Sequence, residues 1–240
     1  MLQIIADDLG LTKSVNEGII FLFKEGKISG ASLMANGEAF DDAAEKLKEI
    51  PDAQIGVHLV LVEEKPLTSI ILPKNHKTFF VKYILGLIKL EDIEKELRAQ
   101  ISKCIRAGIK PAFINSHQHL HLLQGIADIV IKLAKEFKVP YIRIVREPVS
   151  LSGGKLFRKA QLVFLNFLSW MAKKNVIKNG LTCNDFFVGF INAGNLSKID
   201  IAFAIELQKN NPDKIIELGC HPGFENKELV AKYSHWRYHW

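Results

Sequence analysis

Three histidines within five residues are the first sign of chemistry in this chain of 240 residues. His117, His119 and His121 occupy every second position and follow an apolar run at 112–114. If the stretch is a strand that runs into a loop, a period of two places the three imidazoles on the same side. Imidazoles that converge from one strand end suit a transition-metal site or an acid–base site. The alternative is a solvated loop that is merely rich in histidine.

Two adjacent carboxylates, Asp7 and Asp8, follow a short apolar run at 2–6 that has the length of a buried strand. At the end of such a strand they repel each other and lose hydration, so a cation is expected to compensate them. Alternatively, one of them caps the next helix. Thr12 and Ser14 are available for capping, which favours a functional interpretation of the aspartates.

Other ionisable side chains also fall at or near the ends of expected strands. His58 is the one ionisable residue in an apolar run, where a lone histidine is ordinarily a core residue. Arg143 and Arg146 belong to an expected strand at 141–146 and suit either a substrate oxygen or ordinary surface pairs. His221 lies between the last clear strand and a turn with glycine and proline. The aspartate pair and the histidine cluster favour including His58 in a site.

Runs of strand type and helix type alternate along the chain, with about seven strand candidates. This alternation is typical of parallel βα units, and at this length a closed or nearly closed barrel is favoured over an open sheet. We therefore expect a single α/β domain over 1–240, with an insertion around 63–91 that serves as a lid or a substrate-binding segment. Because reacting groups gather at the carboxyl ends of barrel strands, one rim should hold Asp7, Asp8, His58, His117, His119, Arg143 and His221.

Composition narrows the class of protein. Hydrophobic residues make up 48% of the chain, and the net charge of +6 comes from lysines that are spread out rather than aligned. This pattern argues against nucleic-acid binding, and no apolar run has the length of a transmembrane segment. Three distant cysteines and the absence of a signal-peptide pattern favour a cytoplasmic location. The apolar helix expected within 151–175 faces either the core or a partner, and a homodimer is left open.

Four motifs together resemble the YdjC-like carbohydrate deacetylases, a family that includes the chitooligosaccharide deacetylases. In chain order they are ADDLGL at 6–11, GVHL at 56–59, SHQHLH at 116–121 and CHPG at 220–223. The resemblance extends over nearly the whole chain. Two further stretches, ASLMANG at 31–37 and HLVLVE at 58–63, are most similar to the branch associated with hopanoid biosynthesis genes.

The resemblance implies a distorted (β/α) TIM-like barrel and a divalent metal ion held by Asp8, His58 and His117. One carboxylate and two imidazoles leave open positions for water and a substrate carbonyl. They suit Zn²⁺, and Mg²⁺, Mn²⁺, Co²⁺ and Ni²⁺ are also possible with waters that complete the coordination shell. The implied reaction is hydrolysis of the N-acetyl group of an amino sugar, oligosaccharide or glycolipid by metal-activated water.

The same resemblance implies roles for the remaining polar residues. Asp7 would be the general base and His221 a candidate general acid, with His119 and His121 as alternatives for proton transfer. Arg143 or Arg146 would bind sugar hydroxyls or hold Asp7.

Two other functions remain open, namely hydrolysis of another amide or a phosphoester, and a non-catalytic barrel that binds a partner. The chain ends at 235–240, where family members usually continue, so a truncated chain is a further expectation.

Overall fold

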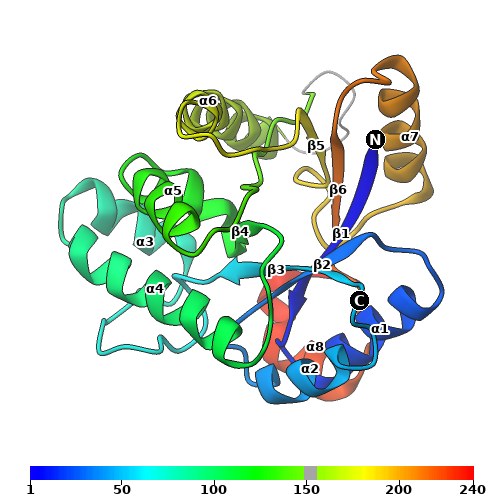
Figure 1. Cartoon of the computed structure of the whole chain (residues 1–240), viewed down its shortest axis with the longest axis horizontal. Helices are drawn as coiled ribbons and strands as arrows, with labels where there is room; N and C mark the ends of the chain where they lie inside the picture. Colours follow the sequence, from blue (N-terminus) through cyan, green and yellow to red (C-terminus); the bar gives the residue numbers. More distant parts are fainter. Residues whose placement is uncertain (149–155) are drawn as a thin grey trace.

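Residues 1–148 and 156–240 are described by the computed structural model. Within these residues six parallel strands form one sheet in the order β4-β3-β2-β1-β6-β5. The sheet curls into a half-barrel (Figure 1). The strands are β1 (Leu2–Leu9), β2 (Gly30–Leu33), β3 (Gln54–Leu59), β4 (Ile114–Ser116), β5 (Phe186–Val188) and β6 (Ile216–Cys220).

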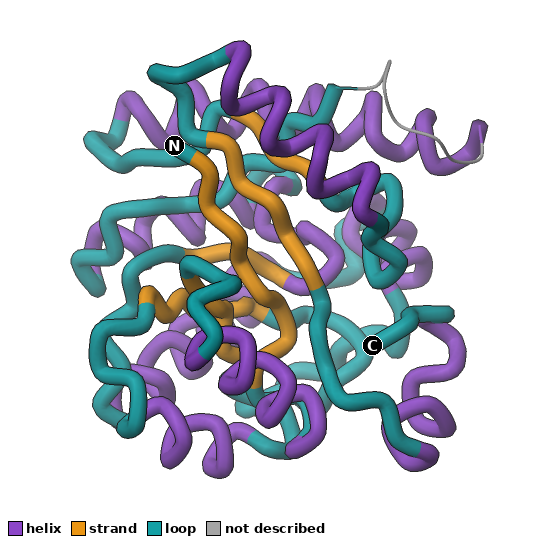
Figure 2. Tube along the Cα trace, turned by 90° about the vertical axis from the view of Figure 1, so that its right-hand side faces the viewer, coloured by secondary structure: helices purple, strands orange, loops and turns teal. Residues whose placement is uncertain are grey.

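Helices surround the strands and supply the outer half of the core (Figures 1 and 2). Thr12 caps the first helix, because its side chain accepts a hydrogen bond from the Val15 amide, and this leaves both aspartates of β1 free as predicted. No helix within the described residues combines the length and the hydrophobicity that crossing a membrane requires. The helices are α1 (Lys13–Lys24), α2 (Phe40–Leu47), α3 (His76–Ile84), α4 (Leu90–Arg106), η1 (His117–Leu122), α5 (Ile126–Glu136), α6 (Leu156–Lys178), α7 (Lys198–Asn210), α8 (Lys227–Tyr233) and η2 (Ser234–Trp236).

The segment 141–146, predicted to be a strand, makes only isolated bridges. It still lies between the two edges of the sheet. The Arg143 amide donates to the Ile114 carbonyl at 3.0 Å, and the Phe187 amide donates to the Arg146 carbonyl at 2.8 Å. The prediction of about seven strands in a TIM-like barrel is therefore not confirmed, and an irregular segment closes the gap that a seventh strand would fill.

Side chains explain why this segment is irregular. The Asn184 side chain accepts from the Ile144 amide at 2.7 Å and donates to the Ile144 carbonyl at 2.6 Å. The Ser169 hydroxyl accepts from the Val145 amide at 3.1 Å and donates to the Val145 carbonyl at 2.8 Å. Since buried backbone groups must be paired, these side chains take the place of a neighbouring strand. An apolar run alone does not reveal such partners.

The predicted insertion at 63–91 contains α3. Asn75 starts the helix, because its side chain accepts a hydrogen bond from the Thr78 amide at 2.9 Å. Gly86, with a φ of 67°, follows the last turn, as a glycine in the left-handed conformation commonly does.

Candidate metal centre

A β-bulge at the end of β1 presents the two aspartates. Ala6 pairs with Ala31 and Leu9 with Leu33, so β1 has one residue more than β2 over this interval, and Asp8 adopts a φ of 65°. Consecutive residues of a regular strand point to opposite faces. The bulge instead brings both carboxylates to one imidazole, because His58 Nδ1 lies 4.0 Å from Asp7 Oδ1 and His58 Nε2 lies 3.2 Å from Asp8 Oδ1.

Asp8, His58 and His117 form a buried cluster from three different strand ends. Asp8 Oδ1 lies 3.3 Å from His117 Nδ1, and one ligand atom from each of the three residues lies within 4.8 Å of the others. Within the described residues both Asp8 oxygens and His58 Nε2 are buried without a properly aligned hydrogen-bond partner. Since a buried carboxylate without a partner is costly, the donor set and its unpaired atoms fit a divalent cation.

Asn115 orients His58. Its Nδ2 donates to Asp7 Oδ1 at 3.0 Å, so its Oδ1 is the atom that accepts from His58 Nδ1 at 2.7 Å. The proton of the neutral ring is then on Nδ1, and the lone pair of Nε2 is directed toward Asp8. An outer partner that fixes the tautomer in this way is typical of metal-binding histidines. Asn115 was not among the predicted site residues, although it directly precedes the SHQHLH motif.

Glu63 is a second residue that the predicted set omits. His117 Nε2 lies 3.3 Å from Glu63 Oε2, and Trp236 Nε1 donates to the same oxygen. Burial alone would lower the pKa of His117, but Asp8 and Glu63 raise it to about 10. The space between Asp8 and Glu63 therefore favours positive charge. In the sequence, the one feature that could have indicated Glu63 is that it is the acidic residue at the end of the HLVLVE stretch.

We expect Glu63→Gln to weaken divalent-metal binding about 10- to 100-fold, because the variant loses a carboxylate that orients a ligand histidine. Isothermal titration calorimetry with Zn²⁺ and Mg²⁺ measures the change. Glu64→Gln is the matched control, since Glu64 accepts from the Tyr233 hydroxyl at 2.9 Å instead. Equal affinity in Glu63→Gln and the wild type would contradict the prediction.

Asp7 is held by a buried guanidinium. Arg143 donates to Asp7 Oδ2 at 2.5 Å and to Oδ1 at 2.9 Å, and the Ser32 hydroxyl donates to Oδ1 at 2.7 Å. Burial alone would raise the pKa of Asp7, but Arg143, with smaller contributions from His58 and His221, keeps that pKa well below its usual range. Arg143 also donates to Glu217. Arg146 is exposed and lies over the Phe186 ring, 5.0 Å from its centroid, so the structure does not bring it to this cluster.

The His-rich stretch does not continue as a strand beyond Ser116. Gln118 and His119 have φ angles of 54° and 55°, so the chain turns sharply. The expectation that His117, His119 and His121 share a side is therefore wrong. His117 faces Asp8, and the His119 ring lies 5.7 Å from each of two phenylalanine rings, Phe187 and Phe190.

The three other histidines among the predicted site residues, His119, His121 and His221, differ in which ring nitrogen atoms lack a partner. His121 has both ring nitrogens occupied, with Nδ1 2.7 Å from the Ser116 hydroxyl and Nε2 2.9 Å from the Arg143 carbonyl. Nδ1 of His119 and Nδ1 of His221 are buried without a partner within the described residues. Burial lowers the pKa of both rings. His119 and His221 thus retain a nitrogen for proton transfer, whereas His121 links β4 to the 141–146 segment.

His121 makes folding stability sensitive to acid. Burial lowers its pKa to about 3 from 6.5, whereas the unfolded ring binds a proton near 6.5, so its contribution is present above pH 6.5 and is lost as the pH falls toward 3. We expect His121→Gln to cost about 1–3 kcal/mol at pH 7. From pH 7 to 5, however, the wild type should lose about 2 kcal/mol more than the variant.

Urea denaturation at the two pH values measures this difference. His239→Gln is the control, because His239 is exposed and its replacement should leave the wild-type pH dependence unchanged. Parallel losses in His121→Gln and the wild type would contradict the assignment.

A polar cleft of about 700 Å³ opens beside the cluster. The Trp236 ring in its wall lies 4.9 Å from the His117 ring, and the Tyr238 ring lies 4.9 Å from the His221 ring. The chain end at 234–240 thus covers both sides of the centre. Other residues that line the cleft are Glu63, Asn75, His76, Lys77, Gln118, Arg158, Ile191 and Ala193.

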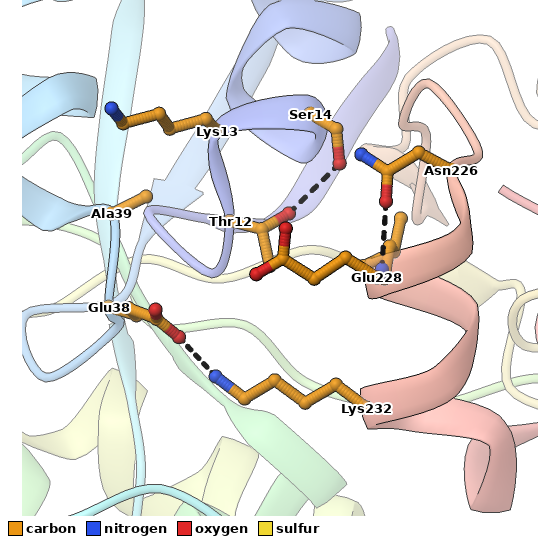
Figure 3. Close-up of a pocket in the computed structure, with 9 residues that line it drawn as sticks. Thr12, Lys13, Ser14, Glu38, Ala39, Asn226, Glu228 and Lys232 are labelled. Atoms are coloured by element: carbon orange, nitrogen blue, oxygen red, sulfur yellow. Dashed lines mark hydrogen bonds and ion pairs between the residues drawn. The ribbon is translucent and has the colours of Figure 1, made fainter.

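A separate pocket of about 340 Å³ lies between the start of α1 and α8 (Figure 3). The Thr12 and Ser14 hydroxyls lie 3.2 Å apart, and Lys232 forms an ion pair with Glu38. Asn226 caps α8. Because Thr12 and Asn226 cap the two helices and Lys232 pairs with Glu38, we assign this pocket to helix packing and capping.

Comparisons with known proteins agree with this architecture. The family model described as YdjC-like protein matches residues 1–239. A carbohydrate deacetylase of Clostridium beijerinckii is 30% identical over 239 residues, covering 96% of this chain and 84% of that protein. A chitooligosaccharide deacetylase of Yersinia enterocolitica is 28% identical over 237 residues, covering 96% of this chain and 85% of the relative.

A solved structure shares the fold. It is an Enterococcus faecalis protein provisionally named a cellobiose-phosphate cleavage protein, with a TM-score of 0.72 at 22% identity. The alignment covers 96% of this chain and 84% of that one. With the family match over nearly every residue, the conclusion is direct: the chain belongs to the YdjC-like protein family.

Proposed function

We propose that the protein removes an N-acetyl group from an amino sugar, oligosaccharide or glycolipid, with a divalent metal ion held by Asp8, His58 and His117. The enzyme class, a hydrolase of carbon–nitrogen amide bonds, follows from the deacetylase relatives. The observation that carries the metal is the convergence of unpaired, buried donor atoms beside a polar cleft.

The proposed mechanism assigns a separate role to the metal ion, Asp7, Arg143 and His221. Asp8, His58 and His117 would hold the divalent ion, which would supply Lewis acidity to polarise a carbonyl oxygen and acidify a water. Asp7 accepts the proton of the attacking water at Oδ2, which has a single donor within the described residues, Arg143. Arg143 keeps Asp7 ionised and fixed. His221 gives a proton to the leaving amine, with His119 as the alternative donor.

The substrate belongs to the same proposal. The cleft of about 700 Å³ is large enough for sugar units, and its wall contains the aromatic rings of Trp236 and Tyr238, which suit the apolar face of a pyranose. We also propose that the protein belongs to the hopanoid-associated branch and that it is located in the cytoplasm. Three unpaired thiols, Cys104, Cys183 and Cys220, support a reducing compartment.

Acetate release from N-acetylated sugars by protein reconstituted with Zn²⁺ or Mg²⁺ tests the proposal. Acetate should appear only with metal and an N-acetylated substrate. The panel includes phosphate monoesters and simple amides, which represent the alternative hydrolases. Phosphate release without acetate release would overturn the assignment, and so would acetate release that survives complete removal of the metal.

A further inference from the structure

Helix α6 turns apolar side chains toward solvent. Phe157 is 67% exposed, Phe167 is 53% exposed and Trp170 is 56% exposed. The buried side of the same helix is also mainly apolar, since five of its six buried residues are apolar and the sixth is Ser169. A surface helix of a soluble domain normally places polar and charged residues on its outward side. The outer side of α6 is therefore suited to an apolar partner.

The apolar surface continues onto α3. The Phe80 and Phe164 rings meet edge to face with centroids 5.8 Å apart, so the two helices are neighbours. Figure 1 shows α3 and α6 on the side of the molecule opposite α7. The end of α3 and the residues after it expose further large side chains, with exposed fractions between 55% and 67%: Val81, Ile84, Leu85 and Leu87. We call the combined surface the α3–α6 face.

Charge distinguishes this face from the rest of the chain. The ranges 74–89 and 156–178 contain four and five Lys or Arg residues, nine in total, and no Asp or Glu, whereas the whole chain has 26 acidic residues. They are Lys74, Lys77, Lys82, Lys89, Arg158, Lys159, Lys173, Lys174 and Lys178. Exposed aromatic and aliphatic side chains among lysines are typical of elements that lie on the surface of an anionic bilayer.

We propose that the α3–α6 face docks the protein on an anionic lipid bilayer. The apolar side chains enter the boundary between headgroups and acyl chains, and the lysines meet the lipid phosphates. A second copy of the chain fits this face less well. A symmetric dimer places the same patch against itself, which would bring the exposed lysines of one copy against those of the other.

A groove leads from this face toward the candidate metal centre. It has a volume of about 370 Å³ and is lined by Val81 and Phe157, among other apolar residues. It shares His76, Gln118 and Arg158 with the polar cleft beside His117. A docked molecule would therefore hold the cleft close to the bilayer. The docking proposal does not depend on the proposed reaction, because it concerns residues outside the metal cluster.

Vesicle co-sedimentation of the full chain tests the proposal. The probes are unilamellar vesicles of phosphatidylcholine, with and without phosphatidylglycerol. We expect binding to the anionic vesicles, weaker binding to the neutral ones and a marked decrease at high salt. The double variant Lys82→Gln and Lys174→Gln should lose about 5-fold in partitioning for each lysine removed. Phe157→Ser with Trp170→Ser should lose roughly 10-fold or more.

Matched controls lie on α7. Lys198→Gln with Lys209→Gln removes two exposed lysines, and Ile199→Ser with Ile201→Ser removes two exposed apolar side chains, so both pairs should bind as the wild type does. Equal losses in the α7 and α3–α6 variants would overturn the proposal, as would the absence of binding to anionic vesicles. Sedimentation equilibrium without lipid tests the other possible occupant of this face, a second copy of the chain. If the protein does not bind vesicles but forms a dimer, and the double variant Phe157→Ser with Trp170→Ser dissociates that dimer, the face would be assigned to a second copy.

Discussion

Asp8→Ala should abolish the binding of a divalent ion. Asp8 is the one carboxylate of the three-residue cluster and lies against both His58 and His117. Its loss leaves two imidazoles, whose neutral donors do not balance the charge of the ion. We expect affinity to fall by more than about 100-fold, beyond the range typical of an outer-sphere substitution. His117→Ala should have the same effect, because it removes the donor that faces Asp8 from another strand.

Metal analysis after dialysis measures the stoichiometry directly, and thermal unfolding gives a readout that does not require activity. A metal present at about 100 times its dissociation constant stabilises the wild type by about 2.7 kcal/mol. Neither variant should gain this stabilisation. His239→Ala is the control, since that imidazole is exposed. Retention of one ion per chain in both Asp8→Ala and His117→Ala would exclude this cluster as the metal site.

The sequence suggested the cluster in two ways: its members are ionisable residues at the ends of expected strands, and they are the ligand set that the family resemblance implies. His58 and the aspartate pair stand out within apolar runs, and their strands, β3 and β1, belong to one parallel sheet in which β2 lies between them. What brings Asp7 and Asp8 to the same imidazole is a bulge, which depends on the register of β1 against β2. Register is a property of two strands together, so the local pattern of one strand does not contain it.

The residues that support the cluster were harder to predict. Glu63 receives a hydrogen bond from Trp236, which is 173 positions away in the chain. The left-handed turn at Gln118 and His119 is equally hidden, because neither residue is a glycine. The loss of the strand at 141–146 depends on Asn184 and Ser169, whose hydrogen bonds need the tertiary structure. Short-range patterns thus gave the donor atoms, whereas long-range contacts determine their orientation.

Asp7→Asn should retain the metal and lose turnover. Asp7 lies outside the three-residue ligand group, so metal stoichiometry should remain at the wild-type value. If Asp7 is the general base, kcat should fall about 100- to 10,000-fold. The substitution also leaves the buried Arg143 guanidinium with Glu217 as its remaining carboxylate. We therefore expect a loss of about 3–5 kcal/mol in the free energy of unfolding.

That loss of stability requires a control with the same electrostatic defect. Glu217→Gln neutralises the other carboxylate on Arg143, which receives the Nε–H and lies 3.1 Å from the Tyr141 hydroxyl. It should destabilise the fold to a comparable or smaller extent, yet retain turnover per folded, metal-loaded molecule. If both variants lost turnover equally, Asp7 would act only by balancing Arg143, and the base would have to be another group. A loss confined to Asp7→Asn would assign proton transfer to Asp7. Both variants remove a carboxylate from Arg143, but only the Asp7 oxygen atoms lie beside the metal cluster.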